Sequence, residues 1–567
     1  MTVGAPPLRE GNNAGGKASA WRAAFFLALA AVALYVYLRN HGLYPAVFAD
    51  EWSYSRMSRL APLAEAMVPS YLYLWLFSAS NACGAGFLEC VRLGNLAFYL
   101  AALPFVHGLA RRHTSQGYAR LLTVLVAAAP LNAYTMYFMP EATYWFGFSV
   151  LSWIMLTRDN WSTLATALAG GLVLGLMSLV KVHALFLLPA LCLYLVYAGW
   201  QVDGAWTRGV TAALAASALA IAVKLALGWM LAGEAGLGLL GSFYQDNVSS
   251  GSTTLRLDLV EPILVSALGH LMALAVMFGV PLAILLHGVS TGALRRQAPA
   301  GRLHAYTLLM LGAAASMAVF YTATLADRGP AEGMRLHLRY YDFVFPLLWL
   351  VAAATIGAAP ADTGRARHLR WVLAALLALL VLVAFARLPD YITRVVDGPE
   401  IAAINMRSTS GHVSAVLQLA LLAAWASGRA QAARLFVLVL LPVLVLVGQD
   451  RIASSASFHQ DSQLGDRAGA LVLESVPPAE RGQLVVAGAD PGVILRVLFH
   501  VDRADTAPLL LAPDQAVPQQ GIAPATRWLL VIGNHAAPSA QMVRQTDEFT
   551  LLRLGAHSHP PAPAGLH

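Results

Sequence analysis

The sequence predicts an all-α polytopic membrane domain followed by a small soluble α/β domain. Of the 567 residues, 58% are hydrophobic and only 12% are charged, and the mean hydropathy is +0.62. A soluble protein of this length needs far more polar surface, so most of this surface is expected to face lipid. Apolar segments fill the chain up to about residue 448, and polar, strand-like sequence follows them.

Thirteen apolar segments are candidates for crossing the membrane, because a hydrocarbon core of roughly 30 Å requires about 20 apolar residues in a helix. They are Trp21–Leu38, Leu88–Ala110, Ala119–Phe138, Tyr144–Leu156, Leu164–Val180, Ala184–Trp200, Val210–Leu231, Pro262–His287, Tyr306–Leu325, Phe343–Ala359, Trp371–Ala386, His412–Ala426 and Leu435–Val447. The segment 144–156 needs its polar neighbours to complete a span. The aromatic segment Met67–Asn81 is short and is expected to lie on the outer membrane surface.

Arginine-rich connections predict the orientation of the chain in the membrane. Loops that remain in the cytoplasm are enriched in Lys and Arg. Two such loops carry Arg111, Arg112 and Arg120, and Arg365, Arg367 and Arg370. They fall on the cytoplasmic side if the N-terminus is cytoplasmic, and the odd number of crossings then places the C-terminal domain outside. The net charge of +7 follows this topology, so we expect no nucleic-acid partner.

The composition divides the chain into four parts. We expect a disordered cytoplasmic tail at 1–20, a transmembrane domain at 21–448, a soluble α/β domain at 449–555 and a Pro-rich disordered tail at 556–567. Within the soluble domain, the sequence predicts strands at Gln483–Gly488, Pro508–Ala512, Trp528–Gly533 and Phe549–Leu554, and a helix at Gly492–His500.

Three cysteines give no metal-binding spacing and allow at most one disulfide. Cys83 and Cys90 are able to pair if their loop faces an oxidising compartment, and the sequence leaves this pairing open. The Ala-, Arg- and Leu-rich, Lys-poor usage is typical of a bacterium with GC-rich DNA, so we expect the chain in a bacterial inner membrane.

Acidic residues in two predicted external turns are the candidate catalytic groups. Asp50 and Glu51 follow the first span, and Glu141 follows Pro140 in the second external turn. A carboxylate at a membrane boundary is able to accept a proton from an attacking hydroxyl and to stabilise positive charge at a sugar carbon. The alternatives are a solvated loop acid for Asp50 and a helix N-terminal acid for Glu141.

Basic residues near the same surface are the candidate phosphate ligands, since arginine forks bind phosphate oxygens in pairs and lysine supplies a point charge. These residues are Lys181, Lys224, Arg335, His337 and Arg339. The alternatives are a lysine that reaches the interface for Lys181, a structural ion pair for Lys224, and pairing with nearby acids for the arginines. Further candidates for substrate binding are Tyr54, Arg92, His183, Tyr340 and Tyr341.

The order and sidedness of these features resemble the GT-C superfamily of membrane glycosyltransferases. That group includes lipid A aminoarabinose transferases, protein O-mannosyltransferases and arabinofuranosyltransferases. The resemblance runs from about Trp21 to Phe343. The matching elements are Asp50-Glu51, the aromatic segment Pro69–Trp75, Glu89 with Arg92, Met139-Pro140-Glu141, Lys181 before an aliphatic run, and His337-Leu338-Arg339-Tyr340.

The resemblance implies a catalytic Asp in the first external loop, here Asp50, and a polyprenyl-phosphate sugar donor. It also implies a lipid, glycan or protein acceptor outside the cytoplasm, and its aminoarabinose and arabinofuranose members favour a pentose. Some members hold a divalent cation near these carboxylates, which would make Asp50 and Glu141 its ligands, while others do not. The chain lacks a His-Pro-Pro element found in some members, which leaves the subfamily open.

Three other functions remain as alternatives. They are a glycan ligase that uses a polyprenyl diphosphate, a transporter or lipid flippase, and a noncatalytic assembly or polymerase-like factor. Transporters usually place charges near the membrane midplane on broken helices in repeated halves. Here the charges gather at one interface and no repeated halves are found, so the sequence favours glycosyl transfer.

Overall fold

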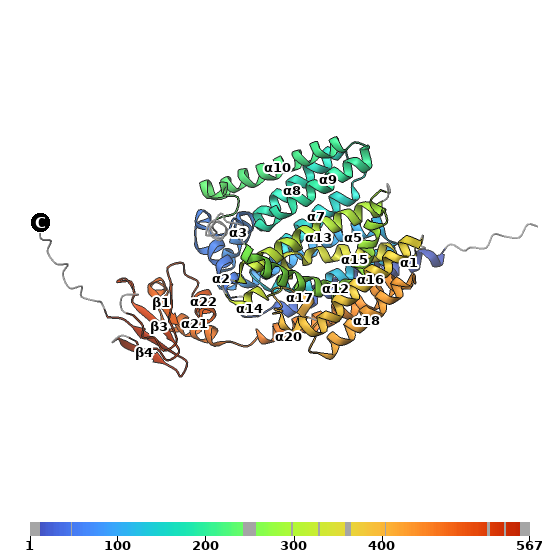
Figure 1. Cartoon of the computed structure of the whole chain (residues 1–567). Helices are drawn as coiled ribbons and strands as arrows, with labels where there is room; N and C mark the ends of the chain where they lie inside the picture. Colours follow the sequence, from blue (N-terminus) through green and yellow to red (C-terminus); the bar gives the residue numbers. More distant parts are fainter. Residues whose placement is uncertain are drawn as a thin grey trace, which may run out of the picture.

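The computed structural model describes residues 12–46, 48–241, 257–295, 299–326, 329–357, 364–402, 404–518, 522–537 and 540–555. It confirms the predicted fold class, since a bundle of apolar helices is joined to a small domain built on one sheet (Figure 1). Residues 1–11 of the predicted N-terminal tail at 1–20 lie outside the described residues, as does the predicted tail at 556–567. Helix α1 begins at Asn12, inside the segment that we expected to be a tail.

The bundle consists of long helices with short helices between them. Its long and medium helices are α1 (Asn12–Asn40), α4 (Phe87–Ala101), α5 (Leu103–His113), α6 (Gln116–Ala127), α7 (Glu141–Thr157), α8 (Thr163–Val180), α9 (Leu188–Asp203), α10 (Trp206–Ala232), α12 (Val260–Ser290), α13 (Pro299–Thr324), α15 (Phe345–Ala354), α16 (Gly364–Arg387), α18 (Thr409–Ala426) and α20 (Leu441–Phe458). The short helices are α2 (Phe48–Ser55), α3 (Tyr71–Ser78), α14 (Pro330–Gly333), α17 (Pro399–Ala402) and α19 (Gln431–Leu435).

The number of membrane-length helices differs from the predicted thirteen. Within the described ranges, 10 helices are long and apolar enough to cross a membrane, or 11 if the bent pair Gln116–Ala127 and Pro130–Met136 is one span. The two remaining predicted segments form α7, of 17 residues, and the short apolar helix Asp342–Ala354. Both begin at a buried acid, Glu141 or Asp342.

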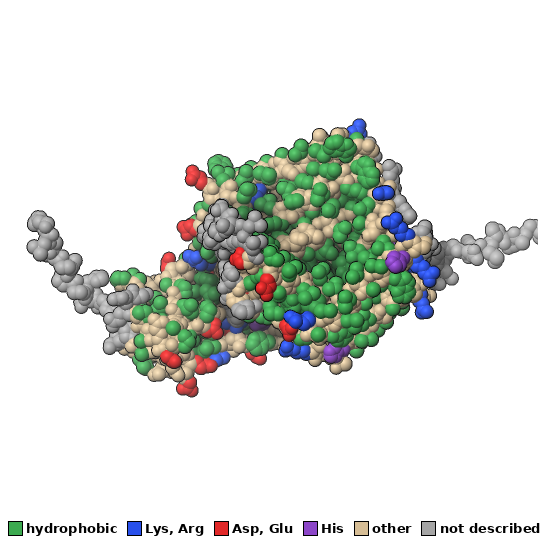
Figure 2. Space-filling model, viewed as in Figure 1, with side chains coloured by type: hydrophobic (Ala, Val, Ile, Leu, Met, Phe, Trp, Pro, Cys, Tyr) green, Lys and Arg blue, Asp and Glu red, His purple; other side chains and the backbone are tan. Residues whose placement is uncertain are grey.

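The two ends of the bundle differ in charge. The N-terminus of α1 and the sheet domain lie at opposite ends of the bundle (Figure 1). On the face drawn in Figure 2, Lys, Arg and His side chains gather at the end where α1 begins, whereas Asp and Glu side chains lie toward the sheet domain. This distribution fits the predicted orientation, with the N-terminus in the cytoplasm and the sheet domain outside.

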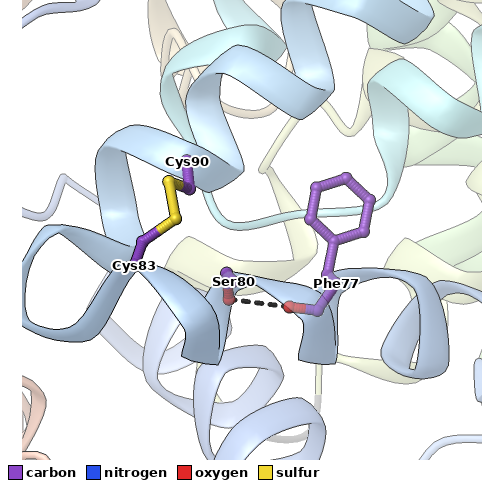
Figure 3. The surroundings of a disulfide bond; sticks show 4 residues. All are labelled: Phe77, Ser80, Cys83 and Cys90. Atoms are coloured by element: carbon purple, nitrogen blue, oxygen red, sulfur yellow. Dashed lines mark hydrogen bonds between the residues drawn. A yellow bond between two sulfur atoms is a disulfide. The ribbon is translucent and has the colours of Figure 1, made fainter.

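The aromatic segment after α2 forms helix α3, whose eight residues are too few to cross the membrane. Cys83 and Cys90 follow it and form a disulfide, which answers the question that the sequence left open (Figure 3). The Ser80 hydroxyl donates a 2.7 Å hydrogen bond to the carbonyl of Phe77 beside the disulfide. Disulfides persist in oxidising compartments, so this bond supports placing the loop outside the cytoplasm.

The small domain contains a five-stranded sheet in the order β2-β1-β3-β5-β4. Its strands are β1 (Leu484–Gly488), β2 (Ala507–Leu510), β3 (Trp528–Ile532), β4 (Gln541–Gln545) and β5 (Phe549–Arg553). The first three run parallel, and β5 and β4 are added antiparallel. Four of these strands were predicted. The sequence did not predict β4 because this edge strand is exposed along its whole length and lacks an apolar face.

Two helices join the sheet to the bundle. Helix α22 (Pro491–Val501) matches the predicted helix. Asp490 is its N-cap residue, and the Asp490 side chain accepts hydrogen bonds from the amides of Gly492 and Val493. The preceding helix α21 (Leu464–Ser475) was not predicted and packs against α22. Helix α20 continues past Gln449 to Phe458, so the predicted domain boundary at residue 449 falls inside a helix.

Buried charged side chains connect the sheet domain to the segment just before α2, the helix that carries Asp50. Arg496 on α22 is 2% exposed, and its Nη2 donates to the carbonyl of Pro45, five residues before Asp50. Arg496 Nε lies 3.2 Å from Asp466 Oδ1 on α21, and the same oxygen is 2.7 Å from His500 Nε2. Arg59 holds Asp502 through two 2.8 Å hydrogen bonds on the other side of the loop.

We expect Asp466→Asn to loosen this contact, because it leaves the buried Arg496 guanidinium without its carboxylate, at a cost of about 3–5 kcal/mol. Limited proteolysis should cleave the connection between α20 and α21 faster than in the unaltered protein. The control is Asp461→Asn, which removes the same charge from an exposed position nearby. Equal cleavage rates in the two variants would contradict the structural role of this ion pair.

Candidate functional site

A cavity of about 570 Å³ lies between the bundle and the sheet domain. Its wall includes Asp50 on α2, three residues of the segment before α15, and Gly492 at the beginning of α22. The structure therefore brings Asp50 together with three predicted site residues that lie almost 300 positions later in the chain. These three residues are Arg335, His337 and Arg339.

Asp50 and Arg339 form an ion pair at the cavity wall. Arg339 Nη1 lies 2.8 Å from Asp50 Oδ2, and the Asp50 side chain is 38% exposed. Burial by itself would raise the pKa of Asp50, but the charge and hydrogen bond of Arg339, helped by Lys181 and Arg335, hold this pKa below the ordinary 3.8. Asp50 is therefore an ionised carboxylate beside a guanidinium, and both groups reach the same cavity.

Asp397 organises the two arginines and was not among the predicted residues. Its buried carboxylate accepts hydrogen bonds of 2.5 Å from Arg335 Nε and 3.0 Å from Arg335 Nη2. It also lies 3.7 Å from Arg339 Nε, and its carbonyl accepts a 2.7 Å hydrogen bond from the Arg339 amide. Nothing in the sequence links Asp397 to residues about 60 positions earlier, so only the fold reveals this contact.

A second, buried ion pair lies behind the arginines. Lys181 Nζ donates a 2.8 Å hydrogen bond to Glu141 Oε1, and both side chains are almost fully buried. Both cations lie near the Tyr340 ring, with Lys181 Nζ at 4.7 Å and Arg339 Cζ at 5.3 Å from its centroid. His183 stacks on the same ring at 4.6 Å. The predicted residues Glu141, Lys181, His183 and Tyr340 thus form one cluster with Arg339.

We expect Glu141→Gln to lower the free energy of unfolding by about 3–5 kcal/mol, because it leaves the buried Lys181 ammonium without a counter-ion. The melting temperature in detergent would report this loss. The double variant Glu141→Leu with Lys181→Met removes both charges and should recover most of the stability. If Glu141→Gln melts at the temperature of the unaltered protein, the buried ion pair is not a stabilising contact.

Two predicted site residues bind backbone groups and do not line the cavity. Both carboxylate oxygens of Glu51 accept amide hydrogen bonds, from Ala46 at 2.6 Å and from Phe138 at 3.0 Å. Arg92 donates to the Met136 carbonyl at 3.0 Å and to Glu89 at 2.8 Å. These contacts favour structural roles for Glu51 and Arg92, because they connect the loop of Asp50 to the turn that precedes α7.

Three other predicted residues lie away from the cavity wall. Tyr54 packs edge-to-face against Tyr73, with centroids 5.5 Å apart. Tyr341 is fully buried and its hydroxyl lies 2.7 Å from His270 Nδ1. Lys224 is fully buried in α10, and its Nζ has no hydrogen-bond partner among the described residues. The structure therefore places none of the three where it would touch a ligand in this cavity.

The cavity also contains residues that the sequence did not single out. Arg394, just before Asp397, adds a third guanidinium to the wall, and His459 lines the wall next to the sheet domain. His337 is buried beside the arginines, and this burial and their charge lower its pKa to about 2, so its ring is neutral. Its Nδ1 lies 2.9 Å from the Thr322 hydroxyl. His337 is thus a neutral hydrogen-bonding group beside the arginines.

The carboxylates proposed as metal ligands do not fit a divalent cation. Asp50 is held by Arg339, and Glu141 is held by Lys181. A bound cation requires several oxygen or nitrogen ligands that converge on one point. The described ranges contain no group of three or more His, Cys, Asp or Glu side chains that could hold one.

The helical bundle, the cavity at one end and the attached sheet domain define a polytopic membrane protein with a small α/β domain. The chain is similar to the crystal structure of ArnT from Cupriavidus metallidurans bound to undecaprenyl phosphate. The TM-score is 0.51 and the identity 15%, over 96% of this chain and 100% of ArnT. No family model and no curated protein sequence matches the chain.

Two further solved structures are more distant. The oligosaccharyltransferase of Archaeoglobus fulgidus, tethered to an acceptor peptide, matches with a TM-score of 0.45 and 13% identity, over 86% of this chain and 64% of its own. The arabinosyltransferase EmbB from Mycobacterium smegmatis matches with a TM-score of 0.42 and 14% identity, over 84% of this chain and 43% of its own.

Proposed function

We propose that the chain is a membrane glycosyltransferase that moves a sugar from a polyprenyl-phosphate carrier to an acceptor hydroxyl on the non-cytoplasmic side. One observation carries this proposal: an ionised aspartate, Asp50, shares a cavity with Arg335, Arg339 and Arg394. Arginine forks match phosphate oxygens, and a carboxylate is able to take a proton from a hydroxyl. ArnT, whose fold this chain shares, is bound to undecaprenyl phosphate.

In the proposed reaction, the acceptor hydroxyl gives its proton to Asp50 while its oxygen bonds to the anomeric carbon. The bond between this carbon and the phosphate oxygen breaks, and the electron pair leaves with the polyprenyl phosphate. The arginines stabilise the charge that this phosphate gains. Asp50 also stabilises the positive charge that develops on the sugar ring. No step requires a metal ion.

The ion pair between Asp50 and Arg339 suggests how donor binding prepares the base. A carboxylate whose pKa is held down by a guanidinium is a weak base. When the donor phosphate binds Arg339, it competes with Asp50 for the same hydrogen-bond donors. Asp50 then loses part of its stabilisation and its pKa rises. Asp50 is therefore a stronger base when the donor is bound than when the site is empty.

The acceptor and the sugar follow from the same proposal. The cavity opens at the end of the bundle where the sheet domain is attached, so an acceptor outside the cytoplasm is able to reach it. A lipid, glycan or protein hydroxyl would fit this chemistry, and the aminoarabinose and arabinofuranose members of the GT-C group favour a pentose. The localisation is the bacterial inner membrane, with the cavity facing the periplasm.

Mass spectrometry of the lipids and envelope glycans from cells with and without the gene tests the function. We expect a lipid or glycan species to lose the mass of one sugar when the gene is deleted, and the intact gene to restore it. Identical lipids and glycans in both strains would overturn glycosyl transfer. A lost species that carries a whole oligosaccharide would instead indicate a glycan ligase that uses a polyprenyl diphosphate.

A further inference from the structure

A second cavity, of about 870 Å³, lies at the end of the bundle where α1 begins. It lies between α1 on one side and α4, α5 and α6 on the other, and it contains no residue of the candidate site. Most of its wall is apolar and comes from Phe25, Phe26, Leu29, Leu100, Leu103 and Pro104. Helix α1 is poorly packed, because only 6% of its most apolar stretch is buried against the rest of the protein. The groove is therefore open beside α1.

Three arginines line this groove. Arg22 lies in the first turn of the membrane-length part of α1 (Ser19–Asn40), Arg111 in the last turn of α5, and Arg120 in the first turns of α6. None of the three has an ion pair with a described residue, and no Asp or Glu of the described residues lines the groove. The neighbouring Arg112, by contrast, is paired with Asp159. The groove therefore presents three uncompensated positive charges at the mouth of an apolar channel.

The length of the groove matches one leaflet of a membrane. Its lining on α1 runs from Arg22 to Ala33, which is about 16 Å of helix at 1.5 Å per residue. One leaflet contributes half of a hydrocarbon core of roughly 30 Å. The arginines thus lie at headgroup level when the apolar lining lies at the level of the acyl chains. His107 and Thr123, which are 3.1 Å apart, supply the polar contact within the groove.

We propose that this groove binds an anionic phospholipid from the leaflet that faces the N-terminus. The acyl chains occupy the apolar channel, and the phosphate lies against Arg22, Arg111 and Arg120. Basic pockets between membrane helices on the cytoplasmic side favour anionic headgroups. Guanidinium groups bind phosphate oxygens through paired hydrogen bonds. The bound lipid fills the poorly packed contact between α1 and the rest of the bundle.

Native mass spectrometry of the purified full chain in detergent, titrated with phosphatidylglycerol or phosphatidylcholine, tests the proposal. We expect the unaltered protein to retain one phosphatidylglycerol in preference to phosphatidylcholine. The double variant R111Q/R120Q should bind phosphatidylglycerol at least about tenfold more weakly, since it loses two phosphate contacts. The matched control is R365Q/R367Q, which removes the same charge from another loop predicted to be cytoplasmic and should bind like the unaltered protein.

A second variant separates lipid binding from the role of arginines in membrane insertion. Ala30→Trp fills the apolar channel and leaves every charge in place, so it should insert normally and still lose the retained phosphatidylglycerol. Equal retention in R111Q/R120Q and in the control would overturn the proposal and leave the arginines with a topological role only. Retention of both lipids to the same extent by the unaltered protein would overturn it as well. None of these outcomes depends on glycosyl transfer.

Discussion

Asp50→Asn should abolish sugar transfer, with a loss of at least about 100-fold, while the protein still inserts and binds its carrier. The asparagine has nearly the same shape as the aspartate, but its amide neither accepts a proton nor stabilises positive charge on the sugar. Cells that carry only this variant should show the lipid and glycan masses of the deletion strain. Because Arg339 keeps the pKa of Asp50 below 3.8 while the site is empty, Asp50 should be ionised between about pH 5 and 8 in the protein without donor.

The control for this variant is Glu65→Gln, which removes one negative charge from an exposed position in the same external loop. It should transfer sugar at the rate of the unaltered protein. Binding of undecaprenyl phosphate, measured for both variants, separates a catalytic loss from misfolding. If Asp50→Asn restores the sugar-bearing species in full, Asp50 is not the base and the mechanism fails.

Arg339→Ala should produce the second large effect, a weakening of carrier binding by about ten- to a hundredfold. The substitution removes a guanidinium that reaches the cavity and makes a charge-assisted hydrogen bond, a kind of contact that contributes about 1.5–3 kcal/mol. It also leaves Asp50 without its partner, so repulsion between this carboxylate and the phosphate adds to the loss. Binding of undecaprenyl phosphate in detergent would measure the change.

Arg387→Ala is the matched control, because Arg387 forms an exposed ion pair with Asp390 and does not line the cavity. Its affinity for undecaprenyl phosphate should equal that of the unaltered protein. Arg339→Lys keeps the positive charge but loses the paired N–H donors of the guanidinium. We expect this variant to recover only part of the affinity for undecaprenyl phosphate. Unchanged binding by Arg339→Ala would place the phosphate elsewhere and refute the proposed site.

The predicted spans show how far hydrophobicity alone describes this bundle. Ten of the thirteen segments became helices of membrane length, because a run of about 20 apolar residues is stable in lipid only as a helix. The helices that begin at Glu141 and Asp342 stay below membrane length, and both of these acids are buried inside the protein. Hydrophobicity does not distinguish a helix that faces lipid from one that ends inside the protein.

The candidate site was predicted in part, and the missing residues share one cause. Asp50, Arg335 and Arg339 stood out because charged residues at a membrane boundary are costly and arginines on the external side contradict the usual charge bias. Asp397, Arg394 and His459 gave no such signal, because each lies in polar sequence where a charge is ordinary. Glu51 was predicted as a catalytic acid, but its role depends on which backbone amides surround it.

The sequence by itself determined the membrane class and the identity of the acids and bases available for chemistry. The membrane class depends on the free energy of transfer from water to lipid. Each residue contributes to this free energy according to its own type and that of its near neighbours. Only the tertiary structure decided that Arg339 holds Asp50, that Lys181 holds Glu141 and that the sheet domain lines part of the cavity. Such pairings depend on distances of a few ångströms between segments far apart in the chain.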